Sequence, residues 1–135
     1  MEPESTSTTC TVEGTKRKFR VLYAEDVRQL RDLVSIVLTK EGHAVDCVPD
    51  GLDALERIQA DPLRYDLIIT DHHMPNLTGL DLVTHLRAMD YAGKIMVFSS
   101  ELSAAVDFAY KQLKVDLVLP KPIFPVTLRA VLATL

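Results

Sequence analysis

The sequence predicts an α/β fold, a doubly wound (βα)5 arrangement whose five parallel strands lie in the order 2-1-3-4-5. Five short apolar runs alternate with segments in which aliphatic residues recur at helical spacing. Strands this apolar must be buried on both faces. In a parallel sheet, the helices of short right-handed β-α-β crossovers cover both faces. Pro120 ends the fifth run, and proline lacks the N–H donor that a central strand needs, so the fifth strand is expected at an edge.

The elements follow in order from residue 19. Each expected strand is a run of β-branched, aromatic or other apolar residues, and each expected helix has apolar residues three or four positions apart. The strands are expected at 19–24, 44–48, 65–70, 94–99 and 116–119. The helices are expected around Leu30 to Leu38, from about Asp50, around Leu82 to Met89, around Leu102 to Leu113, and around Leu128 to Leu132.

Composition narrows the class of protein. The chain has 135 residues, 47% of them hydrophobic, which fits one domain, at 18–135. Residues 1–17 are rich in Ser, Thr and Glu and predict a flexible tail. No apolar run approaches the ~20 residues of a membrane span, and the acidic N-terminus does not resemble a signal peptide, so a cytoplasmic protein without membrane insertion is expected.

Charge and cysteine content exclude other classes. The net charge is −4, and the basic residues are scattered apart from those at 16–20, so no direct nucleic-acid binding is expected. Cys10 and Cys47 are interpreted as free thiols, and no Cys/His spacing is typical of a zinc site.

Polar residues end four of the five expected strands. The first strand is followed by Glu25 and Asp26, the third by Asp71 and the fourth by Ser99, while Lys121 follows the fifth. Neighbouring strands are ~4.8 Å apart, so Asp26 and Asp71 are expected to face each other. Crowded carboxylates repel unless a hard cation such as Mg²⁺ lies among them. A lysine and a hydroxyl opposite the acids suit a phosphoryl group.

At these residues the chain resembles the receiver domain of two-component response regulators, whose fold is flavodoxin-like. The resemblance covers about Phe19 to Leu135. It rests on four separated motifs in family order: the Glu25-Asp26 pair, the stretch "DHHMPNLTGLDL", Ser99 and the Lys121-Pro122 dipeptide.

The resemblance implies a signalling phosphoacceptor and not an enzyme, in a two-component phosphorelay. Asp71 would accept a phosphoryl group from a histidine kinase or a histidine phosphotransfer protein, catalyse its own phosphorylation and dephosphorylation, and control binding of a downstream protein. Asp26, Asp71 and the backbone carbonyl of His73 would bind Mg²⁺ directly, and Glu25 would act through water. Lys121 would bind a phosphoryl oxygen.

Further family features concern the switch. Ser99 would move toward the phosphoryl group as the switch hydroxyl, and the Lys121-Pro122 peptide would be cis. His73 and Glu101, at the mouth of the site, are expected to modulate the lifetime of the phosphorylated state by pairing across the path of the hydrolytic water.

Three positions depart from the family pattern. Glu25 stands where aspartate is commoner, and Val118 takes the place of the aromatic partner of the switch. The glycine that usually ends the fourth helix is replaced within "KQLKVD", which predicts an irregular joint before the fifth strand.

Other functions fit the sequence less well. An FMN-binding module would need a Ser/Thr/Gly-rich phosphate loop after the first strand, where "AEDVRQL" places acids instead. An aspartyl-phosphate hydrolase usually has a second acid two residues after the nucleophile, where this chain has His73. A pseudo-receiver that only binds a partner is disfavoured by the complete set of site residues. A transition-metal site at His72 and His73 is disfavoured because consecutive loop residues usually point apart.

Overall fold

The computed structural model describes residues 17–101 and 103–135 of the chain. Five parallel strands form one sheet in the order β3-β2-β4-β5-β6, which confirms the predicted 2-1-3-4-5 order. Pro120 lies at the end of edge strand β6, as predicted. The strands are β2 Arg20–Ala24, β3 Ala44–Val48, β4 Leu67–Asp71, β5 Lys94–Ser99 and β6 Leu117–Pro120.

Five helices connect and flank the strands. They are α1 Arg28–Lys40, α2 Gly51–Ala60, α3 Gly79–Ala88, α4 Ala104–Gln112 and α5 Pro125–Leu132. Helices α2, α3 and α4 are capped at their N-termini by the preceding residues Asp50, Thr78 and Ser103, whose side chains each accept a hydrogen bond from a backbone N–H of the first turn. None of the described helices is long and apolar enough to span a membrane.

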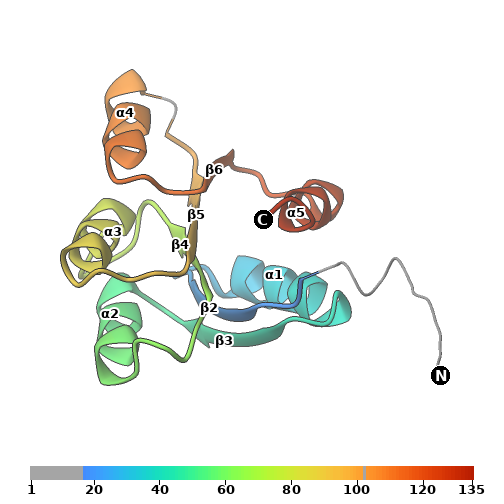
Figure 1. Ribbon diagram of the computed structural model, residues 1–135. Coiled ribbons are helices and arrows are strands. Elements are labelled where there is room, and N and C mark those ends of the chain that lie inside the picture. The colour runs from blue at the N-terminus through green and yellow to red at the C-terminus, as the bar shows by residue number, and fades with distance from the viewer. Residues whose placement is uncertain (1–16, 102) are drawn as a thin grey trace.

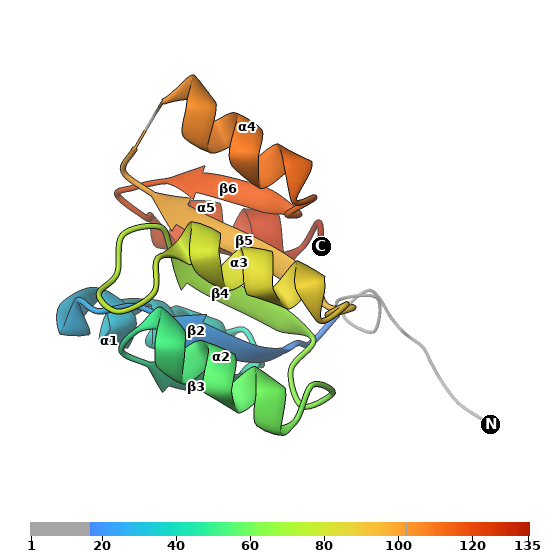
Figure 2. The same cartoon turned by 90° about the vertical axis from the view of Figure 1, so that its left-hand side faces the viewer.

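The helices form two layers around the sheet. Helices α1 and α5 cover one face, and α2, α3 and α4 cover the other (Figures 1 and 2). Strand residues alternate between two separate hydrophobic clusters: Leu22 and Ile68 belong to one, and Val21 and Ile69 to the other. Burial on both faces accounts for the nearly continuous apolar strands.

The joint between α4 and β6 is completed without glycine. Lys114 adopts a left-handed backbone conformation with φ 58°, which glycine usually supplies. The guanidinium of Arg87 on α3 donates to the carbonyls of Leu113 and Lys114, at 2.7 and 2.8 Å. The predicted irregular joint is therefore observed. Lys114 has a left-handed backbone conformation, and its carbonyl and that of Leu113 accept hydrogen bonds from Arg87 on the neighbouring helix α3.

One expected strand is shifted, and two other expectations concern residues outside those that the structure describes. The third strand begins at Leu67 and includes Asp71, which pairs with Phe98 of β5. Leu102, expected in the fourth helix, and residues 1–16 of the expected tail lie outside the described residues.

Candidate functional site

Asp71 is the last residue of β4 and lies at the carboxyl edge of the sheet between β2 and β5. Its side chain is 6% exposed. Oδ1 accepts hydrogen bonds from the backbone N–H of His72, at 3.1 Å, and lies 2.8 Å from Nζ of Lys121. Within the described part of the chain, Oδ2 accepts no hydrogen bond, so this oxygen is available to a ligand.

Lys121 reaches the site from the segment after β6. Its backbone N–H donates to the carbonyl of Ser99 at 2.9 Å, and the Lys121-Pro122 peptide is cis, as the resemblance implied. Nζ also lies 3.4 Å from Oε1 of Glu25. Burial lowers the pKa of Lys121, but the bonds and charges of Asp71 and Glu25 outweigh burial and leave its pKa raised. The ammonium therefore stays charged beside the carboxylates of Asp71 and Glu25.

Glu25 is a fully buried carboxylate that follows β2. It accepts hydrogen bonds from the Tyr23 hydroxyl at 3.3 Å and from the Val27 N–H at 3.2 Å. Burial, and secondly the charge of Asp71, raise the pKa of Glu25 to about 7. Burial likewise raises the pKa of Tyr23, which keeps its hydroxyl a donor toward Glu25. The longer glutamate side chain thus remains directed into the acidic cluster.

Glu25, Asp26 and Asp71 form a group that could bind a metal ion. One carboxylate oxygen from each lies within 4.8 Å of the others. Asp26 is exposed, whereas Glu25 and Asp71 are buried, so the cluster opens to solvent on the Asp26 side. The carbonyl of His73 accepts no hydrogen bond from the described residues. Oxygen donors of this kind fit a hard divalent cation.

Ser99 ends β5 and bonds to the loop that follows it. Its hydroxyl accepts from the N–H of Glu101 at 3.0 Å and lies 3.1 Å from the carbonyl of the same residue. Val118 and Ser99 line a cavity of about 300 Å³ between β6 and the start of α4.

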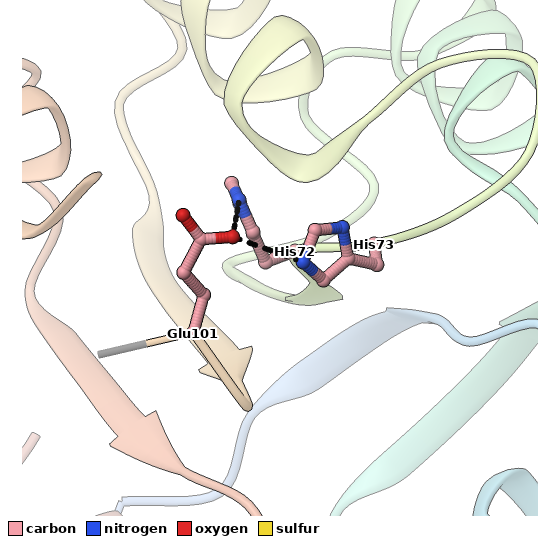
Figure 3. Close-up of side chains that lie close together, drawn as sticks. All are labelled: His72, His73 and Glu101. Carbon is pink, nitrogen blue, oxygen red and sulfur yellow. Dashed lines mark hydrogen bonds and ion pairs between the residues drawn. The ribbon is translucent and has the colours of Figure 1, made fainter. Parts of the chain in front are cut away.

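His72 and His73 point toward the same carboxylate, contrary to the expectation that they point apart (Figure 3). His73 Nε2 lies 3.2 Å from Oε1 of Glu101, and His72 Nε2 lies 4.0 Å from the same oxygen. The pairing of His73 with Glu101 expected from the sequence is therefore present in the geometry.

Tyr110 is a site residue that sequence reasoning missed. Its position in α4 marked it only as core, and it is fully buried. Its hydroxyl lies 2.5 Å from Nδ1 of His72. Burial, and then the charge of His73, lower the pKa of His72. Burial raises the pKa of Tyr110, so the pair is a neutral phenol against an imidazole. No spacing in the sequence connects residues 72 and 110.

Gly79 allows the start of α3 to pass close to the backbone of Asp71 and to the Tyr110 hydroxyl. A Cβ at this position would lie 2.4 Å from the carbonyl oxygen of Asp71 and 2.9 Å from the Tyr110 hydroxyl. The N–H of Gly79 donates to the carbonyl of His72 at 2.9 Å, which fixes the loop between β4 and α3. A side chain at this position would overlap the backbone of Asp71, so only glycine fits here.

Comparison with known proteins shows the family to which the chain belongs. The sequence model of the family described as the response regulator receiver domain matches residues 21–133 of this chain. The Vibrio cholerae chemotaxis protein CheY4 has a similar structure, with a TM-score of 0.77 at 30% identity, covering 86% of this chain and 97% of that one. A response regulator receiver protein from Pseudomonas putida shares the fold, with a TM-score of 0.79 at 24% identity, covering 88% of this chain and 98% of that one.

Longer relatives contain a similar segment. The sensory/regulatory protein RpfC of Xanthomonas campestris is 32% identical over 123 residues, 88% of this chain but 17% of that protein. The transcriptional regulatory protein TctD of Salmonella typhimurium is 33% identical over 103 residues, 76% of this chain and 45% of that protein. The chain thus spans less than half the length of these relatives.

The chain belongs to the response regulator receiver domain family. Its fold, with five parallel strands in the 2-1-3-4-5 order, is the flavodoxin-like arrangement of that family.

Proposed function

We propose that this chain, over residues 18–135, is the phosphoacceptor of a two-component phosphorelay and that Asp71 receives the phosphoryl group. The contact between Asp71 Oδ1 and Lys121 Nζ at 2.8 Å, beside two further carboxylates, carries the proposal. A carboxylate oxygen of Asp71 attacks phosphorus, and the bond from phosphorus to the donor's histidine nitrogen breaks. The donor is a histidine kinase or a histidine phosphotransfer protein.

Mg²⁺ fits the acidic cluster because its donors are all oxygens and one of the acids is exposed to solvent. Asp26, Asp71 and the His73 carbonyl would hold the ion directly, and Glu25 would hold it through water. Bound there, the ion would neutralise charge on the transferring phosphoryl oxygens. Lys121, released from part of its contact with Asp71, binds one of those oxygens.

Ser99 supplies the response to phosphorylation. Its hydroxyl is satisfied by the backbone of Glu101, so turning toward a phosphoryl oxygen breaks both contacts and shifts the β5–α4 loop. Because Val118 occupies the position in β6 where the family usually has an aromatic residue, no aromatic ring at that position moves together with the Ser99 hydroxyl. The altered loop changes the affinity for a downstream protein partner.

His73 and Glu101 shield the site from the hydrolytic water. Their contact at 3.2 Å spans the two loops at the mouth of the site. Both His73→Ala and Glu101→Ala are expected to shorten the lifetime of phosphorylated protein, and the double variant to show a non-additive effect. Lifetimes are measured by the loss of phosphate after removal of the donor, and identical lifetimes in all four proteins would refute shielding.

The phosphoacceptor role is tested with acetyl phosphate and Mg²⁺. Intact-mass spectrometry should show one phosphoryl group on the wild type and none on Asp71→Asn. Asp107→Asn, an exposed acid on α4 that pairs with Lys111, is the matched control and should be phosphorylated normally. Phosphorylation of Asp71→Asn at the wild-type rate would overturn the proposal. Rapid turnover of acetyl phosphate without a lasting phosphoprotein would instead favour a hydrolase.

A further inference from the structure

We propose that His72, His73 and Glu101 form a second metal site, which binds a divalent transition-metal ion of the Zn²⁺ class. The three side chains come from the loops after β4 and β5, and both imidazoles face one carboxylate (Figure 3). Their ligand atoms all lie within 4.8 Å of one another. The set is separate from the acidic cluster, because it shares no side chain with Glu25, Asp26 and Asp71.

The distances suit tetrahedral ligation with small adjustments. Zinc bonds of 2.0–2.2 Å place neighbouring ligand atoms about 3.4 Å apart. The separation of His73 Nε2 from Glu101 Oε1 is 3.2 Å, and that of His72 Nε2 from the same oxygen is 4.0 Å. The side chains of His73 and Glu101 are 64% and 37% exposed, so both can move toward an ion. Water would complete the fourth position.

His72 is the fixed ligand of the three. Its side chain is 9% exposed, and its Nδ1 contacts the buried hydroxyl of Tyr110 at 2.5 Å. When Nδ1–H donates to this hydroxyl, the lone pair of Nε2 faces Glu101 and is free to bind metal. An outer hydrogen bond of this kind is the usual partner of a metal-ligating histidine. Tyr110 itself is fully buried, and its hydroxyl lies where a side chain at Gly79 would otherwise be, 2.9 Å from the position of an added Cβ.

Ligand chemistry separates this site from the acidic cluster. Two imidazole nitrogens and one carboxylate are typical of Zn²⁺, Cu²⁺ and Ni²⁺ sites, whereas Mg²⁺ prefers oxygen donors only. His73 would serve both places through different atoms, since its carbonyl belongs to the oxygen set and its ring to the nitrogen set. Zn²⁺ should therefore bind while millimolar Mg²⁺ is present.

The ion would also act on the switch, and this consequence rests on the proposed function. Glu101 holds the Ser99 hydroxyl through its backbone N–H and carbonyl. An ion that joins Glu101 to His72 and His73 fixes the β5–α4 loop against the β4–α3 loop. Phosphorylation at Asp71 should therefore slow when Zn²⁺ is bound, because Ser99 is less free to turn.

Isothermal titration calorimetry with Zn²⁺ tests the site, using the whole 135-residue chain in millimolar Mg²⁺. The background carries Cys10→Ser and Cys47→Ser, so that no thiol contributes. One equivalent of Zn²⁺ should bind. His73→Gln and Glu101→Gln each remove a direct ligand. Each should weaken Zn²⁺ binding by more than about 10-fold, which is the smallest loss usual when only an outer hydrogen bond to a ligand is removed. Tyr110→Phe should weaken it by about 10–100-fold.

His85→Gln is the matched control, because His85 is an exposed histidine on α3 whose Nδ1 lies 2.8 Å from the Asp81 carbonyl. It should bind Zn²⁺ like the background protein. Long-range ¹H–¹⁵N spectra should show Zn²⁺ shifting Nε2 of His72 and His73 while Nδ1 of His72 stays protonated. Asp71→Asn should lose phosphorylation but still bind Zn²⁺, so the metal site and the phosphoacceptor role can fail separately. Equal affinity in His73→Gln and the background, or full competition by Mg²⁺, would overturn the proposal.

Discussion

Replacing Glu25 by Gln should stabilise the metal-free protein at neutral and higher pH. The carboxyl of Glu25 is buried beside Asp71, and its pKa rises from an ordinary 4.5 to about 7. Between these values the folded state binds a proton that the unfolded state has lost, so stability falls as pH rises through this window. Below about pH 4.5 the Glu25 carboxyl is protonated in both the folded and the unfolded state, so its ionisation does not lower the free energy of unfolding.

The magnitude follows from the size of the shift. One pKa unit corresponds to 1.36 kcal/mol, so the shift has a ceiling of about 3 kcal/mol. The charge of Lys121, 3.4 Å from Glu25, already opposes this shift, and we expect ionisation of Glu25 to lower the free energy of unfolding by about 1–3 kcal/mol, up to that ceiling. Glutamine forms different hydrogen bonds with Tyr23 and Val27. Only the pH-dependent part of the stability difference therefore reports on ionisation.

Urea denaturation in EDTA at several pH values from 4.5 to 8 measures this difference. The stability of Glu25→Gln relative to wild type should increase through the window and level off above about pH 7. Glu56→Gln, an exposed acid on α2, should give a flat difference. Added Mg²⁺ should reduce the advantage of Glu25→Gln, because the cation offsets the charge of the wild-type cluster. A pH-independent difference for Glu25→Gln would refute the account of a buried, destabilised carboxylate.

Substitutions at two further positions, Lys114 and Gly79, test the backbone conformation. Lys114→Gly should stabilise the protein by roughly 0.5 kcal/mol, because relief of the ~1–2 kcal/mol left-handed cost exceeds the ~0.5–1 kcal/mol entropy cost of glycine. Lys114→Ala, which keeps the cost, should give no gain in the same urea titration. Gly79→Ala should destabilise by about 1–3 kcal/mol, since its Cβ would lie 2.4 Å from the Asp71 carbonyl oxygen. An unchanged urea midpoint for Gly79→Ala would contradict this prediction and show that the loop between β4 and α3 can move away from the added methyl group.

The strand order and the acidic cluster could be predicted because they depend on local pattern and on one rule of sheet geometry. Apolar runs define the strands, Pro120 marks an edge, and parallel strands bring their carboxyl ends together. Glu25, Asp71 and Lys121 each lie next to the end of a strand, so a correct strand order sets them at one edge.

Other parts of the site depend on tertiary packing that no short pattern encodes. The direction of His72 follows from the path of the loop past Gly79 and from a hydroxyl 38 residues away on α4. The left-handed conformation of Lys114 is supported by Arg87 on a different helix. Consecutive histidines converge here because one is buried against Tyr110 and the other turns across the loop toward Glu101.

The attachment of α4 to the sheet depends unusually on one side chain. Tyr110 is the single buried residue of α4, whereas α2 and α3 each bury four. Few buried contacts give an element low local stability, so α4 is the helix most readily displaced from this face of the sheet. The hydroxyl of Tyr110 ends on His72, the residue directly after Asp71, and not on the sheet. Helix α4 is therefore held in place by a residue next to Asp71 in the acidic site, and any movement of His72 acts directly on Tyr110, which anchors the helix.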